Sequence, residues 1–318
     1  MKILANDGIS ESGKATLENA GFEVMVTKVA QEQLENFINE EAINVIIIKN
    51  NTEIHTELID NCPTLKIIAN ASTSNDNIDV IYAEECGLQI VNIADASANA
   101  IAELVFAHLL GMARFLHQSN REMPLEGDMS FNALKKQFSN GTELRGKTLG
   151  IIGMDNSGQQ VAKLALGLGM KVVAYDVDYD NTITIPVEFF NGQIIDIEID
   201  VISSDELFTD SHFISLHLSA QDNHVIGTKE FEKMKDGVGF INVSQAGLVD
   251  EIALINAIES GKVKYAALDS FENQPKPEIQ LLMNSELSLS PNIAAYTQEA
   301  QHKIGTELAD KIINSVHV

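Results

Sequence analysis

Residues 147–176 constrain the fold of this chain more than any other segment. They predict a strand at 147–152, a glycine-containing turn at 153–158 and a helix at 159–169. A second strand follows at 171–175 and ends at the acidic residue Asp176. Two parallel strands joined through a helix form a βαβ unit, and such units build parallel sheets that are covered by helices on both faces. The segment therefore predicts an α/β fold.

The turn itself reads Gly-Met-Asp-Asn-Ser-Gly and departs from a dinucleotide-binding turn at one position. Gly153 and Gly158 match the first and third glycines of G-x-G-x-x-G, whereas Asp155 replaces the second, which lets backbone approach the cofactor pyrophosphate. A carboxylate about 4 Å from the phosphates, at an effective dielectric constant near 20, costs about 4 kcal/mol. The predicted pyrophosphate-binding positions are Gly153, Asp155, Asn156, Ser157 and Gly158. We expect their binding of the pyrophosphate to be weak or absent.

Composition limits the classes of partner and the compartment. A chain of 318 residues with 45% hydrophobic residues is long enough for about two domains. Its net charge of −25 argues against nucleic acid and anionic membranes as partners. Cys62 and Cys86 are too few for a disulfide framework and lack metal-ligand spacing, so we expect a cytoplasmic protein without a metal site.

Short runs rich in Val, Ile and Leu alternate with helical patterns along most of the chain, which is typical of parallel α/β layers. The other predicted strands are residues 2–5, 23–26, 45–48, 66–69, 88–91, 213–218, 238–243 and 265–268. The other predicted helices are residues 11–20, 78–86, 98–118, 229–234, 250–260 and 297–316.

In this order, the segments resemble the NAD-dependent D-2-hydroxyacid dehydrogenase family, and within it the 3-phosphoglycerate dehydrogenases without a regulatory domain. The motifs that carry the resemblance are Asp-Asn-Ile-Asp at 76–79, Glu-Leu-Arg-Gly-Lys-Thr-Leu-Gly-Ile-Ile-Gly at 143–153, Gly-Leu-Val-Asp-Glu at 247–251 and Ala-Leu-Asp-Ser-Phe-Glu at 267–272. The resemblance implies two doubly wound parallel-sheet domains around a cleft. Residues 1–97 and 297–318 would form a flavodoxin-like substrate domain, and residues 98–296 a Rossmann NAD-binding domain.

The family's catalytic residues are replaced by amides. By their surrounding motifs, Gln245 stands at the position of the arginine that binds the substrate carboxylate, Gln274 at that of the orienting glutamate, and Asn292 at that of the acid/base histidine. Amides keep hydrogen bonding but neither exchange a proton near neutral pH nor carry a charge. None of the eight histidines falls in these segments, and Tyr296, one turn after Asn292, is interpreted as a packing residue.

The implied substrate pocket has also lost positive charge relative to the usual family pattern. Lys49 keeps a positive charge where the family usually has arginine, but Asn70, Ser72 and Ser74 stand where a basic residue and two glycines are usual. A Cβ at the glycine positions hinders close approach of a carboxylate to backbone amides. We therefore expect a less cationic pocket that disfavours a phosphorylated acid.

Some cofactor features implied by the resemblance persist. Asp176, ~20 residues beyond the turn, would bind the adenosine ribose hydroxyls and favour NAD, although a turn or capping role also fits a strand end. His217 would lie at the cofactor's edge or serve structure, and Asp269 would contact the nicotinamide amide. NAD is thus the implied cofactor, with weakened or absent binding.

Three functions remain open from the sequence. The first is a non-catalytic, homodimeric member of the family with a structural or regulatory role, acting on a protein partner such as an active paralogue. The second is an NAD(H)-binding sensor module. The third is an active NAD-dependent oxidoreductase that acts on the CH–OH group of a 2-hydroxy acid.

Overall fold

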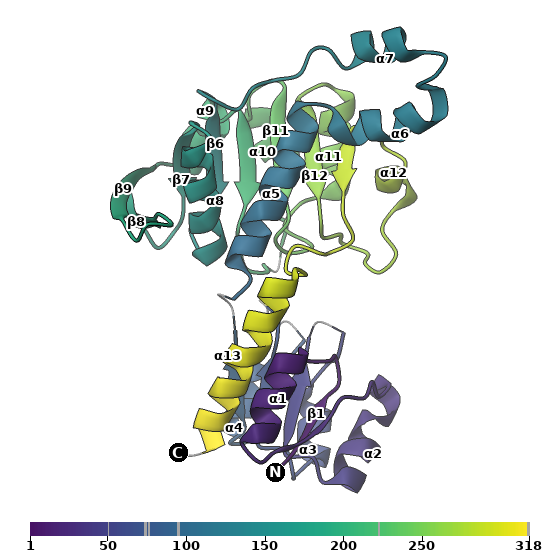
Figure 1. The fold of residues 1–318 in the computed structure, drawn as a ribbon, viewed down its shortest axis with the longest axis vertical. Coiled ribbons are helices and arrows are strands. Elements are labelled where there is room, and N and C mark those ends of the chain that lie inside the picture. The colour runs from purple at the N-terminus through teal and green to yellow at the C-terminus, as the bar shows by residue number, and fades with distance from the viewer. Residues whose placement is uncertain (50, 73–74, 76, 94–95, 222, 317–318) are drawn as a thin grey trace. The chain divides into compact units, whose positions relative to one another are not determined.

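The computed structural model describes residues 1–49, 51–72, 75, 77–93, 96–221 and 223–316. The chain divides into two compact units (Figure 1): unit 1 is Met1–Ser97 with Ala295–Val318, and unit 2 is Ala98–Ala294. The chain thus returns to unit 1 at Ala295, two residues before the expected boundary at 297.

Unit 1 is a five-stranded parallel sheet in the order β2-β1-β3-β4-β5, which is the flavodoxin-like order. Its strands are β1 Lys2–Ala5, β2 Glu23–Met25, β3 Val45–Ile48, β4 Ile67–Asn70 and β5 Gln89–Asn92. Its helices are α1 Glu11–Asn19, α2 Gln31–Glu41, α3 Thr56–Asn61, α4 Val80–Glu85 and α13 Gln298–Val316.

The strands of unit 1 are buried on both faces. Along β1, Ile3 packs in one hydrophobic cluster with residues of α1 and α13, whereas Leu4 packs in a second cluster with residues of α2 and α3. Strands covered on both sides read as continuous apolar runs, which is why 45–48 (Val-Ile-Ile-Ile) was recognisable in the sequence. Helices α1 and α13 touch through glycines, because a Cβ on Gly13 would overlap the backbone of Gly305.

Unit 2 is an eight-stranded sheet in the order β13-β12-β11-β10-β6-β7-β9-β8. Its strands are β6 Thr148–Ile152, β7 Lys171–Tyr175, β8 Thr182–Glu188, β9 Ile194–Val201, β10 Phe213–Leu216, β11 Val238–Asn242, β12 Val263–Leu268 and β13 Leu287–Leu289. Its helices are α5 Ala98–Ala113, α6 Leu116–Glu126, α7 Phe131–Gln137, α8 Asn156–Gly167, α9 Ser204–Asp210, α10 Thr228–Lys233, α11 Glu251–Glu259 and α12 Ile279–Leu282. Neighbouring strands are parallel except for the antiparallel pair β8 and β9.

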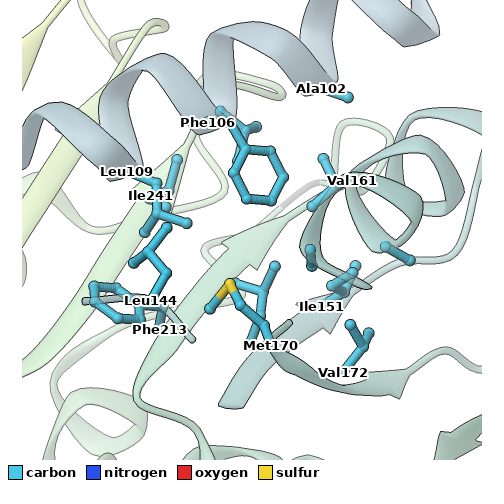
Figure 2. Close-up of a cluster of buried hydrophobic side chains, with 14 of the residues drawn as sticks. Ala102, Phe106, Leu109, Leu144, Ile151, Val161, Met170, Val172, Phe213 and Ile241 are labelled. Carbon is cyan, nitrogen blue, oxygen red and sulfur yellow. The ribbon is translucent and has the colours of Figure 1, made fainter. Parts of the chain in front are cut away.

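Two hydrophobic clusters fix the sheet of unit 2 between its helices. In the cluster of Figure 2, Phe106 and Leu109 of α5 face Ile151 of β6 and Val161 of α8. Residue Ile152, next along β6, belongs to the second cluster, together with residues of α9, α10 and α11. Because successive strand residues point to opposite faces, β6 is anchored from both sides and its end is held in place.

The single long helix expected over 98–118 is wrong. Helix α5 ends at Ala113, Phe115 has a positive φ of 55°, and α6 begins at Leu116. The ring of Phe115 packs near those of Phe138 and Tyr265, with centroids 6.2 and 6.0 Å away. These aromatic contacts hold a left-handed backbone residue that periodicity alone cannot reveal.

Among the residues that the structure describes, the bent pair α5 and α6 is the one segment that approaches the length and apolarity of a membrane-spanning helix. Among the described residues, no single helix is long and apolar enough to cross a membrane, whereas α5 and α6, bent by 59°, reach that length and composition together.

The hairpin β8–β9 at the sheet edge was not expected from the sequence. Strand β8 alternates buried Ile183 and Ile185 with exposed neighbours, and Gly192, with a φ of +80°, lies in the connecting loop. The period-two pattern and the Asn191-Gly192 turn were present in the sequence as a hairpin signal.

Candidate active site

The turn between β6 and α8 is closed by two glycines that a side chain cannot replace. Gly153 has a φ of +93°, and a Cβ there would overlap the carbonyl of His217. A Cβ on Gly158 would overlap the carbonyl oxygen of Gly153. Helix α8 begins at Asn156, three residues before the expected start, so Ser157 and Gly158 lie in its first turn.

Asp155 is the N-cap of α8, and its carboxylate lies at the helix N-terminus. Its Oδ1 accepts hydrogen bonds from the Gly158 amide at 2.8 Å and from the Ser157 hydroxyl at 2.7 Å. The first-turn amides and the positive end of the helix dipole are what dinucleotide sites offer to a pyrophosphate. In this chain an internal carboxylate already uses the Gly158 amide, and its backbone φ of −61° is unstrained.

Behind the cap, a chain of buried hydrogen bonds continues through Ser157 to His217. Ser157 Oγ lies 2.8 Å from His217 Nδ1, and Ser215 Oγ lies 2.9 Å from His217 Nε2. Because the Ser157 hydroxyl proton is given to Asp155, Nδ1 of His217 must donate and Nε2 must accept from Ser215. Burial lowers the pKa of His217 to about 4 against the attraction of Asp155, so its ring is neutral at pH 7.

Asp176 joins the end of β7 to the turn. Its Oδ2 accepts from the Met154 amide at 2.6 Å, and its Oδ1 accepts from the Asp178 amide at 2.9 Å. The structure thus gives Asp176 a turn role. The contact with a cofactor ribose stays a prediction.

Asp269, after β12, is almost fully buried and has its carboxylate saturated. Oδ1 accepts from the Ser290 hydroxyl at 2.5 Å and the Ile293 amide at 3.0 Å, and Oδ2 accepts from the Ala294 amide at 2.8 Å. The carboxylate therefore holds residues 290–294, the loop that carries Asn292. Its predicted contact with the nicotinamide amide is not tested by these bonds.

A second buried histidine supports this loop. Nε2 of His108, on α5, lies 2.9 Å from Ser290 Oγ, and Nδ1 of the same ring lies 2.8 Å from Ser288 Oγ. Burial lowers the pKa of His108, while Asp269 opposes the shift. Asp269, Ser290, His108 and Ser288 thus repeat the order carboxylate, serine, histidine, serine seen behind Asp155. The sequence carried a signal for both chains, since Ser215 with His217 and Ser288 with Ser290 are i, i+2 pairs.

Two of the three residues predicted to stand at catalytic positions lie together. Gln274 Oε1 accepts a hydrogen bond from Asn292 Nδ2 at 3.3 Å, and both side chains are exposed on unit 2. Asn292 has a φ of 55°, and its amide donates to the Asp269 carbonyl at 2.7 Å. Gln245 lies in the loop after β11, where its carbonyl accepts from Asn242 Nδ2 at 3.1 Å. The three positions thus present neutral amides.

In unit 1, the predicted pocket residues follow the carboxyl ends of β3 and β4. Lys49 Nζ donates to Gln301 Oε1 at 2.9 Å and lies 5.2 Å from the ring centroid of Tyr296. Burial lowers the pKa of Lys49, while Asp7 raises it. Lys49 is therefore a cation at this edge, with its ammonium near a side-chain amide and an aromatic ring.

The loop after β4 is braced by side-chain amides. Asn70 Oδ1 accepts from the Ser72 amide at 3.0 Å and from its hydroxyl at 2.6 Å, and Asn70 Nδ2 donates to Asn75 Oδ1 at 2.8 Å. Ser74, the remaining predicted position, lies outside the described residues. In the described ranges, no group of three or more His, Cys, Asp or Glu could hold a metal ion.

Comparison with curated proteins gives relatives along the full length. The chain is 36% identical to hydroxypyruvate reductase of Thermotoga maritima, over all of this chain and 99% of that protein. It is 34% identical to D-3-phosphoglycerate dehydrogenase of Methanocaldococcus jannaschii, over 98% of this chain but only 57% of that protein's length.

Comparison with solved structures agrees with this result. A glyoxylate reductase from Paecilomyes thermophila superposes with a TM-score of 0.83 at 27% identity, covering 99% of this chain and 94% of that one. D-lactate dehydrogenase from Aquifex aeolicus, solved with NAD and lactic acid, gives a TM-score of 0.76 at 25% identity, covering 100% and 96%. Residues 106–294 match the family model described as D-isomer specific 2-hydroxyacid dehydrogenase, NAD binding domain. The chain therefore belongs to the D-isomer specific 2-hydroxyacid dehydrogenase family.

Proposed function

We propose that this chain is a non-catalytic member of its family, which binds NAD(H) weakly and acts in a structural or regulatory role. The observation that carries the proposal is the hydrogen bond between Gln274 and Asn292, at the positions where the family resemblance puts a glutamate and a histidine. An amide pair preserves the contact but has no proton to exchange near pH 7. Loss of general acid/base catalysis alone lowers a rate roughly 10²- to 10⁴-fold.

Binding of the substrate should also be weak, because a neutral amide again stands where the family resemblance puts a charged side chain. Gln245 brings no charge to the position that resemblance assigns to a carboxylate-binding arginine, and a charged bidentate hydrogen-bond pair is about twice as strong as a neutral one. Residues that act as a unit are not additive, so these losses are not multiplied. Their common direction supports loss of hydride transfer.

The turn residues do not fit a pyrophosphate well. A phosphate at the N-terminus of α8 would compete with the Asp155 carboxylate for the Gly158 amide and would be repelled by it. At about 4 Å and an effective dielectric constant near 20, the repulsion is on the order of 4 kcal/mol. That corresponds to roughly a thousandfold loss of affinity.

Calorimetric titration with NADH tests this fit. We expect no binding tighter than about 100 µM by the wild-type protein, since 4 kcal/mol turns a sub-micromolar site into one near the millimolar range. Asp155→Asn keeps the helix cap but removes the charge, so it should bind NADH more tightly. Asp180→Asn, which neutralises an exposed carboxylate after β7, is the matched control and should change nothing. Wild-type binding tighter than about 10 µM would refute the assignment of Asp155.

Turnover assays test the loss of catalysis. With NADH and glyoxylate, hydroxypyruvate or phosphohydroxypyruvate, the wild-type protein should show no turnover, and a rate near ~10 s⁻¹, ordinary for an enzyme, would sink the proposal. The combined variant Asp155→Gly, Gln245→Arg, Gln274→Glu, Asn292→His should gain measurable turnover. An inactive but folded combined variant would show that the site has also been reshaped elsewhere.

A cytoplasmic homodimer that pairs with or regulates an active paralogue is the form we propose for this role. The acidic charge of −25 disfavours nucleic acid and anionic membranes as partners. Sedimentation of the purified chain tests the dimer, and a monomer at micromolar concentration would contradict it.

A second candidate is an active NAD-dependent oxidoreductase on a 2-hydroxy acid, and Lys49 is the observation that favours it. Burial lowers the pKa of Lys49 and its ammonium lies over the Tyr296 ring, which makes Lys49 the candidate for proton transfer in this second function. If the wild-type chain turns over a 2-oxo acid, Lys49→Met should abolish that activity, whereas Lys14→Met, a half-buried control on α1, should not. NADH binding without turnover would instead favour an NAD(H) sensor.

A further inference from the structure

A small pocket in unit 2 gathers positive charge at the edge of the sheet opposite the candidate active site. Its volume is about 150 Å³. Its lysine, histidine and aspartate lining residues are Lys147, His212, Lys235, Asp236 and Lys264. They lie just before or within the first residues of β6, β10, β11 and β12, whereas the dinucleotide turn follows the other end of β6. Four steps of strand separate the two ends of β6 by about 13 Å, so the pocket and the turn are distinct.

The charge of this pocket runs against that of the molecule. The chain has 46 acidic and 21 basic residues, yet the pocket lining has three lysines and one carboxylate. That carboxylate, Asp236, is 2.9 Å from Lys262, which is not part of the lining. The pocket therefore holds an excess of positive charge from half-buried Lys147 and Lys235 and from exposed Lys264.

The ammonium groups of Lys235 and Lys264 each contact a neighbouring group. Lys235 Nζ donates to the Asp210 carbonyl at 2.7 Å, and Lys264 Nζ lies 4.8 Å from the ring centroid of Tyr265. His212 Nδ1 accepts from the Thr148 amide at 3.1 Å, which leaves Nε2 as the protonated nitrogen of the neutral ring. Burial lowers the pKa of His212, and Lys235 and Lys147 lower it further, so the positive field reaches the imidazole.

Size and donor type identify the class of ligand. A volume of about 150 Å³ is larger than the ~30 Å³ that a single water molecule takes up in the liquid, so the pocket admits a phosphate group. Lysines bind phosphate as point charges, whereas planar bidentate recognition is the property of arginine, which is missing from this lining. We propose that the pocket binds inorganic phosphate or the phosphate group of a small monoester.

Titration of the full-length protein with inorganic phosphate, at constant ionic strength in a chloride buffer, tests the proposal by calorimetry. We expect saturable binding at one site per chain. The variant Lys147→Gln, Lys235→Gln, Lys264→Gln should bind roughly tenfold more weakly or not at all, since three ionic contacts are lost. Absence of saturable binding by the wild-type protein would overturn the proposal.

A matched control separates local recognition from general charge. Lys135→Gln, Lys136→Gln, Lys229→Gln removes three exposed lysines of unit 2 that do not line the pocket, so it should keep wild-type affinity. An equal loss in both triple variants would mean nonspecific attraction and would contradict a built site. Glycerol phosphate and succinate distinguish a phosphate site from a general anion site, and equal affinity for succinate would overturn the phosphate assignment.

A measurement on the wild-type protein does not depend on any variant folding. Because a bound anion stabilises the imidazolium, phosphate should raise the pKa of His212, followed by NMR and assigned with His212→Gln. An unchanged His212 pKa at saturating phosphate would refute binding here. Phosphate binding that is altered by Asp155→Asn but not by the triple pocket variant would place the anion at α8 instead and would also refute the proposal.

Discussion

A side chain at position 158 should destabilise the protein, although position 155 in the same turn carries an aspartate. An added Cβ at Gly158 would fall on the Gly153 carbonyl oxygen, well inside the 3.0 Å that real Cβ atoms respect. The obstacle is the carbonyl group of Gly153, which is part of the turn backbone. Gly153 has a φ of +93°, and its carbonyl cannot rotate away. Helix α8 must therefore shift outward, and overpacking of this kind costs about 1–3 kcal/mol. We expect Gly158→Ala to lower the free energy of unfolding by that amount or more.

The matched control is Gly167→Ala at the other end of α8. Nothing lies within 4 Å of a Cβ there, and its φ is not positive. Alanine should therefore stabilise the protein by about 0.4–1 kcal/mol, because it reduces the entropy of the unfolded chain. Urea denaturation of the two variants should give unfolding free energies that differ by about 1.4–4 kcal/mol in favour of Gly167→Ala.

Equal stability of these two variants would refute the close approach of α8 to the turn. A second readout separates strain from a general effect of alanine. If α8 shifts, the Gly158 amide moves from the Asp155 carboxylate, so hydrogen exchange at the first turn of α8 should accelerate in Gly158→Ala alone. Unchanged exchange together with lost stability would place the strain elsewhere.

Further predictions concern the two buried histidine chains. The pKa of His217 is about 4 in the folded protein and 6.5 for a free histidine, so the unfolded state binds more protons between these values. The free energy of unfolding should thus fall by up to about 3 kcal/mol as the pH drops from 6.5 to 4. In acid denaturation curves, His217→Gln should show a weaker dependence of this free energy on pH. An unaltered dependence would contradict a neutral buried ring. Ser290→Ala removes a donor from the Asp269 carboxylate and should lower the unfolding free energy by about 1.5–3 kcal/mol, whereas Ser288→Ala removes a neutral bond and should lower it by about 1 kcal/mol. The reverse order in thermal denaturation would refute the proton assignments.

Much of the fold could be predicted, because both sheets are built from buried parallel strands. Strands at 2–5, 45–48 and 171–175 have the expected bounds, and the remaining expected strands are shifted or shortened by one or two residues, except that β12 begins two residues earlier than expected. The misses are elements without a continuous apolar run. The hairpin β8–β9 is half exposed at the sheet edge, and the break at Phe115 depends on aromatic packing between segments far apart in the sequence.

The position of the candidate site is an expectation from the sequence, whereas its hydrogen bonds could be seen only in the structure. The sequence placed Gln274 and Asn292 at related positions, and the structure joins them by a hydrogen bond. It identified Asp155 as a charge in the turn but gave no sign that its carboxylate caps α8. Which partner an aspartate side chain selects depends on atoms brought together by the turn, and composition does not encode such distances.

The location of the departures from the family motifs is compatible with the proposed loss of chemistry without loss of structure. Asp155, Gln274 and Asn292 are exposed, whereas Ser157, His217 and the other members of the two histidine chains are buried and hydrogen-bonded. Breaking a buried polar chain leaves unsatisfied groups at about 1–3 kcal/mol each, while exposed polar exchanges change stability by less than about 0.5 kcal/mol. Substitution at the exposed positions can therefore remove acid/base chemistry while the framework that positions them stays intact. A chain of this kind retains a rigid, specific surface, which is what a structural or regulatory role requires.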